Sequence, residues 1–157
     1  MQSIELSMHQ ASGDVSVEEA LRKRRSVREY SRKPLRLGEV SQLLWAGQGL
    51  TDPRGLRTAP SAGALYPLEL YVAIGNVERV PSGVYWYNPL EHKLIRTVQG
   101  DVRDELTAAA LWQAWIGEGA IVIAFGAVYQ RTTVKYGERG IRYVHIEVGH
   151  AAQNVFL

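Results

Sequence analysis

A run of very small residues stands directly before an alternating apolar segment, and this junction is the strongest constraint on how the chain can fold. The stretch reads "TAPSAGALYPLELYVAIG", from Thr58 to Gly75. Ordering such a backbone is costly in conformational entropy unless something must approach it closely. The minimal side chains of residues 61–64 would let a flat ring lie against the backbone and accept hydrogen bonds from its amides. The alternative is a tight turn into the strand, and the residues alone favour neither reading.

Composition narrows the class of protein. The 157 residues suit one domain, 1–157, and 46% hydrophobic with 22% charged residues is ordinary globular usage. Eighteen Lys+Arg against 16 Asp+Glu leave a net charge of +2, so we expect no broad cationic surface and no nucleic-acid partner. The absence of cysteine excludes disulfides, thiolate nucleophiles and Cys-ligated metal centres.

The N-terminal sequence and the longest apolar run predict the cellular location of the protein. "MQSIELSMHQASGDVS" lacks a basic segment followed by an apolar one, so it does not resemble a secretory signal. The apolar run Ala120 to Tyr129 is too short to span a bilayer. We therefore expect a soluble, cytoplasmic protein with no membrane partner.

The order of helical and extended patterns predicts an α+β domain with a largely antiparallel sheet. Ser16 and Glu19 form a capping box that starts a helix, and Asp101 can cap another that runs through Leu111. The run Ala120 to Tyr129 predicts a strand buried on both faces. Further helices are expected over 37–47 and from 138 onward, and further strands over 68–74, 83–87 and 92–97.

A basic cluster follows the first helix. In "RKRRSVREY", an extended chain would place Arg24, Ser26 and Arg28 on one side, with about 13 Å between the two arginines. This pattern suits a ligand with a phosphate at one end, because guanidinium groups bind phosphate bidentately. A solvated helix end explains the same residues and is favoured by spacing alone. A nucleic-acid site is a third reading, without aromatic interleaving to support it.

Two motifs together resemble a known family. "RRSVREY" and "APSAGALYPLELYV" resemble the flavin-binding signature of the nitroreductase superfamily, and the second motif is similar to the SagB/ThcOx-type branch, the azoline dehydrogenases. That branch oxidises thiazoline and oxazoline rings of ribosomal peptides to thiazoles and oxazoles. The resemblance covers the chain from about Val17 to Leu157. It implies a three-layer α/β/α fold with a mostly antiparallel central sheet.

The resemblance also implies a homodimer with FMN at the subunit interface. Arg24 and Arg25 would hold the phosphate, Ser26 the ribityl chain or the nearby phosphate, and Arg28 the N1 and O2 edge of the flavin. Positive charge at that edge favours the anionic reduced flavin. The residues implied to line the isoalloxazine are Pro60, Ser61, Ala62, Gly63 and Leu65.

Lys135 and Tyr136 match a Lys-Tyr pair that this branch associates with proton removal from the azoline. Aromatising such a ring requires a hydride acceptor and a base at neighbouring atoms. Lysine or tyrosine can serve once burial and neighbouring charge lower its pKa. By itself a Lys-Tyr pair is more often a surface feature, so its position in the flavoprotein pattern carries this prediction.

The motif "HIEVGH" contains side chains that could bind a metal ion, but helical geometry argues against a metal site. Glu147 and His150 would lie about 200° and 140° around a helix from His145, whereas a zinc-binding pair needs positions i and i+4 on one face. We therefore predict no metal site. The two histidines are expected to be packed or to lie at an interface.

The chain departs from the family pattern in two places, and these departures affect which function and which domain boundary are predicted. Related nitroreductases carry Asn and Gln where this chain reads Ala64 to Tyr66, which favours the azoline-oxidising branch over a generic NAD(P)H-dependent nitro or quinone reductase. Family members also continue past the last helix into a further strand with a basic residue, so we expect the domain to be C-terminally incomplete. The alternatives are a flavin-binding or partner-binding module without turnover, or such a generic reductase. The predicted substrate is a small molecule or peptide, with NAD(P)H as a possible electron donor.

Overall fold

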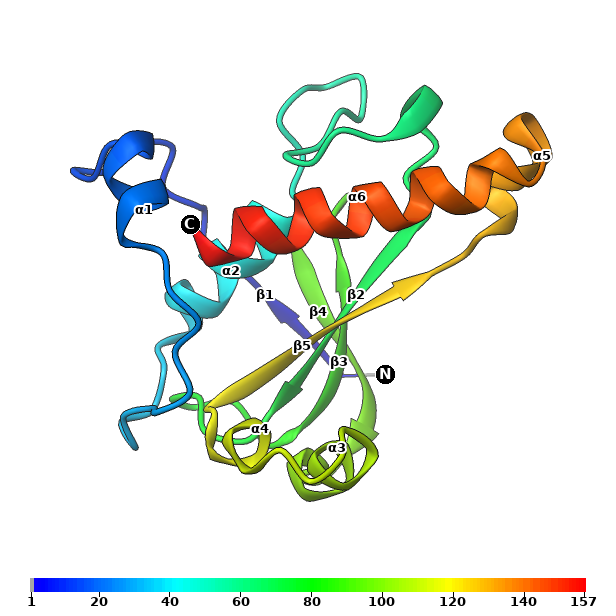
Figure 1. The fold of residues 1–157 in the computed structure, drawn as a ribbon. Coiled ribbons are helices and arrows are strands. Elements are labelled where there is room, and N and C mark those ends of the chain that lie inside the picture. The colour runs from blue at the N-terminus through cyan, green and yellow to red at the C-terminus, as the bar shows by residue number, and fades with distance from the viewer. Residues whose placement is uncertain (1) are drawn as a thin grey trace.

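The computed structural model describes residues 2–157 as an α+β fold on a five-stranded sheet (Figure 1). The strand order is β1-β4-β3-β2-β5, and each pair of neighbouring strands is antiparallel. The strands are β1 Ser3–Glu5, β2 Leu68–Ile74, β3 Gly83–Asn88, β4 Lys93–Gln99 and β5 Ile121–Ala127. The helices are α1 Val17–Lys23, α2 Leu37–Gln48, the short 3-10 helix η1 Ala62–Ala64, α3 Arg103–Ala109, α4 Ala114–Glu118, α5 Gln130–Tyr136 and α6 Arg139–Phe156. The predicted class and antiparallel sheet are confirmed.

The start of α1 follows from its capping residue. The Ser16 hydroxyl accepts a hydrogen bond from the Glu19 amide at 3.2 Å, as the capping box predicts. At the β3–β4 turn, the Asn88 side chain accepts from the Leu90 amide at 3.0 Å. These local bonds explain why the first helix and the hairpin could be located from sequence.

The core forms where α2, α6 and β2 meet. Val40 and Leu44 of α2 and Leu70 and Val72 of β2 are fully or almost fully buried. Helices α2 and α6 pack together across one face of the sheet (Figure 1). At their crossing, a Cβ added to Gly47 would lie 3.0 Å from Leu70 Cδ2 and 3.2 Å from Val155 Cγ2. The absence of a side chain at residue 47 therefore allows this close packing.

Strand β5 differs from the prediction of a strand buried on both faces. It pairs with β2 along its whole length, from Leu68↔Ala127 to Ile74↔Ile121, and it is the edge of the sheet. Six of its seven residues are partly buried, and Ala124 is exposed. The prediction of burial was wrong because a continuous apolar run reports hydrophobicity but not strand order.

The helix predicted from Asp101 to Leu111 is shorter than expected. Helix α3 ends at Ala109, and Leu111 adopts a positive φ of 59° that no α-helix contains. Asp101 does accept the Arg103 amide at 3.1 Å, but Val102 is the N-cap residue. The short helices α4 and α5, and strand β1, were not predicted. Within residues 2–157, no helix has the length and hydropathy needed to cross a membrane.

Leu44→Ala tests the position of the core. Leu44 has 0% exposure, so this substitution should lower the free energy of unfolding by about 2–5 kcal/mol through lost burial and the cavity it leaves. Leu90→Ala is the matched control, because Leu90 is 72% exposed and should change stability by less than about 0.5 kcal/mol. Urea unfolding of both variants measures the difference. Equal losses would contradict the described core.

Candidate functional site

The small-residue run folds into a compact loop that keeps two amides available. Ser61 closes the loop twice: its carbonyl accepts the Ala64 amide at 3.0 Å, and its hydroxyl accepts the Tyr66 amide at 2.9 Å. The amides of Ala62 and Gly63 have no acceptor among residues 2–157. Gly63 is exposed, so donors at this position can reach a ligand.

Three residues of this loop adopt left-handed backbone conformations. The φ angles are 66° at Gly63, 54° at Ala64 and 44° at Tyr66. Positive φ costs little at glycine and more at the other two residues. Such unfavourable conformations persist only where the surrounding structure holds them, and they are enriched at ligand sites.

Lys135 and Tyr136 lie against this loop. A Cβ added to Gly63 would lie 2.7 Å from Tyr136 Oη and 3.0 Å from Lys135 Nζ. Both side chains come from the end of α5, where Lys135 is exposed and Tyr136 is partly buried. The Lys135 ammonium is 5.4 Å from the centre of the Tyr136 ring. The structure therefore brings together the predicted catalytic pair and the predicted flavin-lining run.

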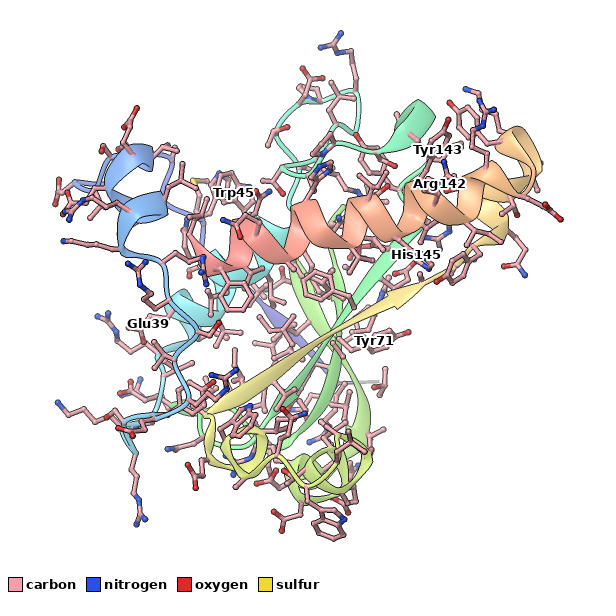
Figure 2. The ribbon with its side chains drawn as sticks, in the orientation of Figure 1. Glu39, Trp45, Tyr71, Arg142, Tyr143 and His145 are labelled. Atoms are coloured by element: carbon pink, nitrogen blue, oxygen red, sulfur yellow. The ribbon has the colours of Figure 1, made fainter. Side chains whose placement is uncertain are left out.

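Helix α6 contacts one member of the predicted catalytic pair. The Tyr143 ring meets the Tyr136 ring edge to face, with centroids 5.2 Å apart. Figure 2 shows Tyr143 on the side of α6 that faces η1, while His145 lies on the side toward β5. There His145 Nε2 and the Tyr129 hydroxyl are hydrogen-bonded at 2.9 Å. Residues 2–157 contain no cluster of three His, Cys, Asp or Glu side chains that could hold a metal ion.

Arg131 ties α5 to the loop and to the sheet, and sequence analysis missed it. Its guanidinium donates to the Tyr66 carbonyl at 3.1 Å and pairs with Glu69 of β2 at 2.5 Å. Glu69 also accepts from the Trp86 indole at 2.7 Å. The signal was its position four residues before Lys135, which places both on one side of a helix. It went unused because no helix was predicted there.

A buried polar cluster underlies the loop. Arg57 donates to Gln48 Oε1 at 2.8 Å and stacks over the Tyr66 ring at 4.6 Å, while its amide donates to the Tyr66 hydroxyl at 3.2 Å. Burial lowers the pKa of Arg57, opposed by the nearby Glu69, Tyr66 and Glu147. Several buried polar atoms have no hydrogen-bond partner in residues 2–157: Gln48 Nε2, Arg57 Nε, Thr132 Oγ1 and Glu147 Oε1. Buried polar groups usually have partners, so these atoms call for an explanation.

Glu147 is the acidic member of this cluster. It is only 3% exposed, on the face of α6 that meets the loop. Burial raises the pKa of Glu147, and a hydrogen bond with Ser61 and the charge of Arg57 oppose that rise. The side chain considered above as a metal ligand is instead a buried carboxyl beneath the small-residue loop.

The basic cluster lies elsewhere on the chain. Residues 24–30 form no helix or strand, and Arg25, Ser26 and Arg28 are exposed while Arg24 is partly buried. Arg25 turns back onto its own backbone and donates to the Arg22 and Arg24 carbonyls at 3.0 and 2.7 Å. Arg28 lies over the Trp115 ring of α4 at 5.2 Å.

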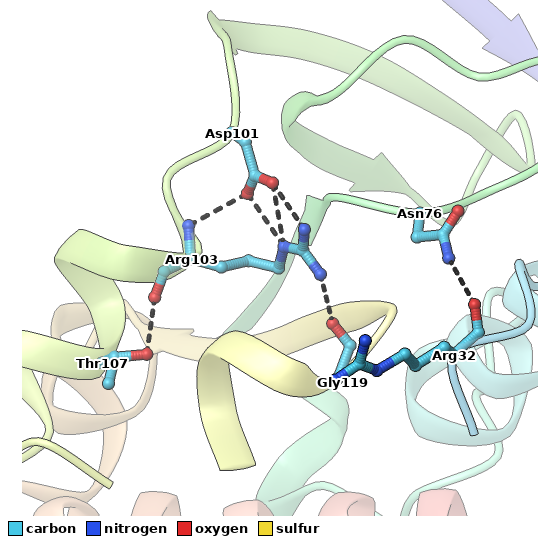
Figure 3. Close-up of polar contacts among 6 residues, drawn as sticks. All are labelled: Arg32, Asn76, Asp101, Arg103, Thr107 and Gly119. Carbon is cyan, nitrogen blue, oxygen red and sulfur yellow. Dashed lines mark hydrogen bonds and ion pairs between the residues drawn. The ribbon is translucent and has the colours of Figure 1, made fainter. Parts of the chain in front are cut away.

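The segment after the cluster is attached to the sheet (Figure 3). The Asn76 side chain donates to the Arg32 carbonyl at 3.2 Å, and the Leu35 amide donates to the Asn76 carbonyl at 3.1 Å. Nearby, Arg103 pairs with Asp101 and donates to the Gly119 carbonyl at 2.7 Å. These bonds fix where the segment carrying the arginines meets the sheet.

One chain does not bring the arginines and the small-residue loop together. Figure 1 shows α1 at the C-terminal end of α6 and η1 near its N-terminal half. Helix α6 has 18 residues, about 27 Å of length at ~1.5 Å per residue. If both regions touch one ligand, they must therefore come from two chains.

Comparisons with known proteins identify the family of the chain. The model of the Nitroreductase family matches residues 21–157. A Methanocaldococcus jannaschii protein that carries the name nitroreductase is 52% identical over 144 residues, 92% of this chain and 73% of its own. A crystal structure from Ralstonia eutropha, also described as a nitroreductase, has a TM-score of 0.84 at 27% identity and covers 99% of this chain and 70% of its own. These matches confirm the resemblance and the nitroreductase fold.

A more distant likeness concerns the fold alone. The Escherichia coli microcin synthetase McbBCD complex, solved with truncated pro-MccB17 bound, contains a chain that matches with a TM-score of 0.68 at 22% identity. The alignment covers 98% of this chain and 62% of that one. The same arrangement of elements therefore occurs in a chain of a peptide-modifying complex.

Gly63→Ala tests the contact between the loop and α5. The new Cβ adds about 1–2 kcal/mol of backbone strain at positive φ and must also displace the ends of Tyr136 and Lys135. Gly55→Ala is the matched control, since its φ is 89° and nothing lies within 4 Å of an added Cβ. Both variants should lose similar stability, but only Gly63→Ala should shift the NMR signals of the Tyr136 and Tyr143 rings. Unchanged ring signals would contradict the contact.

Proposed function

Because the chain belongs to the nitroreductase family, a family of oxidoreductases whose members generally bind flavin, we propose that it is an FMN-dependent oxidoreductase of the SagB-type branch, oxidising azoline rings to azoles. The observation that carries the proposal is the contact of Lys135 and Tyr136 with Gly63 in the small-residue loop. A candidate base therefore lies beside the backbone on which we place the flavin ring. Such an oxidation requires a base next to the hydride acceptor.

The residues present fit an FMN. The amides of Ala62 and Gly63 have no acceptor among residues 2–157, and the exposed backbone of Gly63 can be approached by a flat ring. The proposed ring-lining residues are Pro60, Ser61, Ala62, Gly63 and Leu65. The guanidinium groups of the partly buried Arg24 and the exposed Arg25 suit a phosphate, with Ser26 beside it and Arg28 at the electron-rich edge of the ring.

Lys135 and Tyr136 would remove the proton. Conversion of an azoline to an azole removes a hydride from one ring atom and a proton from its neighbour, and FMN, when bound, supplies the hydride acceptor. Lys135 is exposed and can reach a substrate above the loop, whereas Tyr136 is held between Gly63 and Tyr143. Arg131 keeps both in place by anchoring α5 to Tyr66 and Glu69. A second redox partner must then reoxidise the flavin to complete the cycle.

The assignment to the SagB-type branch rests on the residues of the small-residue loop and on structural similarity to one solved structure. Residues 64–66 carry alanine, leucine and tyrosine instead of amides, so the loop offers few side-chain donors to a nitro or quinone oxygen. A chain of a microcin synthetase complex shares the fold. Against this, the named relatives favour a generic NAD(P)H-dependent reductase as the second candidate.

The proposed assembly is a homodimer. Exposed apolar side chains gather on α5 and α6, among them Val134 at 88% exposure, Ile141, Ile146 and Phe156. A second copy would bury part of this surface and could bring its arginines to the loop of the first chain. Members of the family are typically dimeric, which supports the same assembly.

Lys135→Ala tests the catalytic assignment. The purified protein should be yellow and release FMN on denaturation, and with a thiazoline-containing peptide each product ring should lose two hydrogens by mass. Lys135→Ala should slow this oxidation by about 10²–10⁴-fold while the bound flavin remains, because general bases contribute on that scale. Lys33→Ala removes an exposed lysine outside the site and should have no effect.

The outcome separates the two candidate functions. Oxidation that persists in Lys135→Ala would overturn the base assignment. Bleaching of the flavin by NADPH and turnover of a nitroarene, with no azole formed, would support the generic reductase. A protein that remains colourless when mixed with FMN would overturn both.

Mixed dimers test whether the site is shared between chains. Arg24→Ala/Arg25→Ala and Lys135→Ala should each be inactive alone, the first through lost phosphate binding. If the arginines and Lys135 of one site come from different chains, mixed dimers hold one intact site. Subunit exchange of equal amounts should then restore about a quarter of the parent activity, since about half of the dimers are mixed. No recovery, with exchange verified by mass spectrometry, would place all these residues on one chain.

A further inference from the structure

We propose that Arg57 is a positioning residue for the small-residue loop. Its guanidinium, stacked on the Tyr66 ring, fixes the end of this loop and thereby raises the affinity of the loop for its ligand. This inference rests on the proposed function, because it takes FMN as that ligand. It adds to that function a cation that acts on the loop through Tyr66.

Tyr66 ends the loop in a conformation that needs support. Its φ angle is 44°, and the next residue is Pro67. A residue before proline normally has an extended backbone with negative φ, and positive φ is costly for any residue except glycine. The Tyr66 amide donates to Ser61 Oγ at 2.9 Å, and its carbonyl accepts from Arg131 at 3.1 Å. These bonds hold the backbone of Tyr66 but leave its side chain to other contacts.

Arg57 supplies the contacts to the side chain of Tyr66. The guanidinium carbon of Arg57 lies 4.6 Å from the centre of the Tyr66 ring. The backbone amide of Arg57 donates to the Tyr66 hydroxyl at 3.2 Å. Both residues are partly buried, and a cation over an aromatic ring attracts it more strongly when water is partly excluded. One residue therefore holds the ring at its face and at its hydroxyl.

Arg57 is itself fixed by the C-terminal end of α2. Its guanidinium donates to Gln48 Oε1 at 2.8 Å, and Gln48 is 1% exposed. The next residue, Thr58, donates through its amide to the Gly49 carbonyl at 3.0 Å and through its hydroxyl to the Trp45 carbonyl at 3.1 Å. Both the side chain and the backbone beside it are thus held. A residue can position another precisely only when its own conformation is fixed in this way.

The polar contacts of Arg57 also indicate a role beyond pairing with a carboxylate. The ion pairs found within residues 2–157 do not include Arg57, and its Nε is buried without a partner there. A buried donor without a partner lowers stability. This cost is explained if the guanidinium is retained because its face matches the Tyr66 ring.

The effect of Arg57 reaches the ligand through the shape of the loop. With Tyr66 fixed, Ser61 closes the loop, and the amides of Ala62 and Gly63 have no acceptor among residues 2–157. Movement of Tyr66 would break its bond to Ser61 and release these amides from their positions. A loop that is already ordered loses less conformational entropy on binding, so its affinity for a ligand is higher.

Hydrogen exchange tests the effect on the loop without flavin. In the flavin-free protein, Arg57→Ala should raise exchange of the Tyr66 amide by about tenfold, because the ring loses the cation that holds it. Exchange of the Val72 amide in the central strand β2 should not change. Arg54→Ala is the matched control, since Arg54 lies three residues earlier and its side chain is 78% exposed. Faster exchange at both Tyr66 and Val72 would show a loss of overall stability and overturn the inference.

Titration with FMN tests whether Arg57 acts through Tyr66. Arg57→Ala and Tyr66→Leu should each weaken FMN binding by about tenfold, because each removes the stacked pair. Tyr66→Phe keeps the ring and should weaken binding by only about threefold, through the lost hydroxyl. The combined variant Arg57→Ala/Tyr66→Leu should bind FMN as Tyr66→Leu does, since the interaction is already absent.

The outcomes separate this inference from the proposed function. Losses that multiply to about a hundredfold in the combined variant would show that Arg57 does not act through Tyr66, and would overturn the inference. If FMN binds the parent but neither exchange nor affinity responds to Arg57→Ala, this inference alone is overturned. If exchange responds but no form binds FMN, the flavin assignment fails, and the role of Arg57 toward that ligand fails with it.

Discussion

The whole site depends on how closely the small-residue loop approaches the end of α5. A side chain at residue 63 would have to displace the end of Tyr136, since an added Cβ would fall 2.7 Å from the tyrosine oxygen. The loop must also bend through left-handed conformations at residues 63, 64 and 66, which only glycine accepts without cost. At residue 63 the absence of a side chain therefore serves both space and backbone geometry.

Holding such a loop requires contacts from several elements, and helix α6 supplies two of them. Tyr143 packs against Tyr136 of α5, and Asn154 donates to the Thr58 carbonyl. Arg57 and Arg131 support the other side through Tyr66. The loop is thus fixed by side chains that do not themselves face a ligand, which is how catalytic geometry is kept precise.

The sequence predicted those parts of the fold that depend on local signals. The capping serine of α1, the alternating strand β2 and the hairpin β3–β4 all carry such signals, and all were located correctly. Strand order is not a local property, so β5 was taken as buried although it is an edge strand. Helix α5 was missed because seven residues with little apolar periodicity leave no helical pattern.

In the candidate site, too, residues in local motifs were predicted, whereas residues that depend on long-range contacts were not. Lys135, Tyr136 and residues 60–65 were selected by motif, and the fold brings them together. Arg57 and Arg131 carry no motif, since their importance comes from contacts between segments distant in sequence. The burial of Glu147 was not predicted, because a pattern of residue types cannot tell that a carboxyl is buried.

Several groups around the small-residue loop lower the stability of the fold, and this cost indicates that they serve function. Buried polar atoms without partners and alanine or tyrosine at positive φ each lower stability, and several of them lie around the segment 57–66. The core of α2 and β2, by contrast, is apolar and closely packed. Positive φ also occurs at Arg79, His92, Leu111 and Trp112, but around the segment 57–66 it coincides with buried polar atoms that lack partners within residues 2–157. A region that combines the two is expected to serve function. That region is the surface on which we place the flavin.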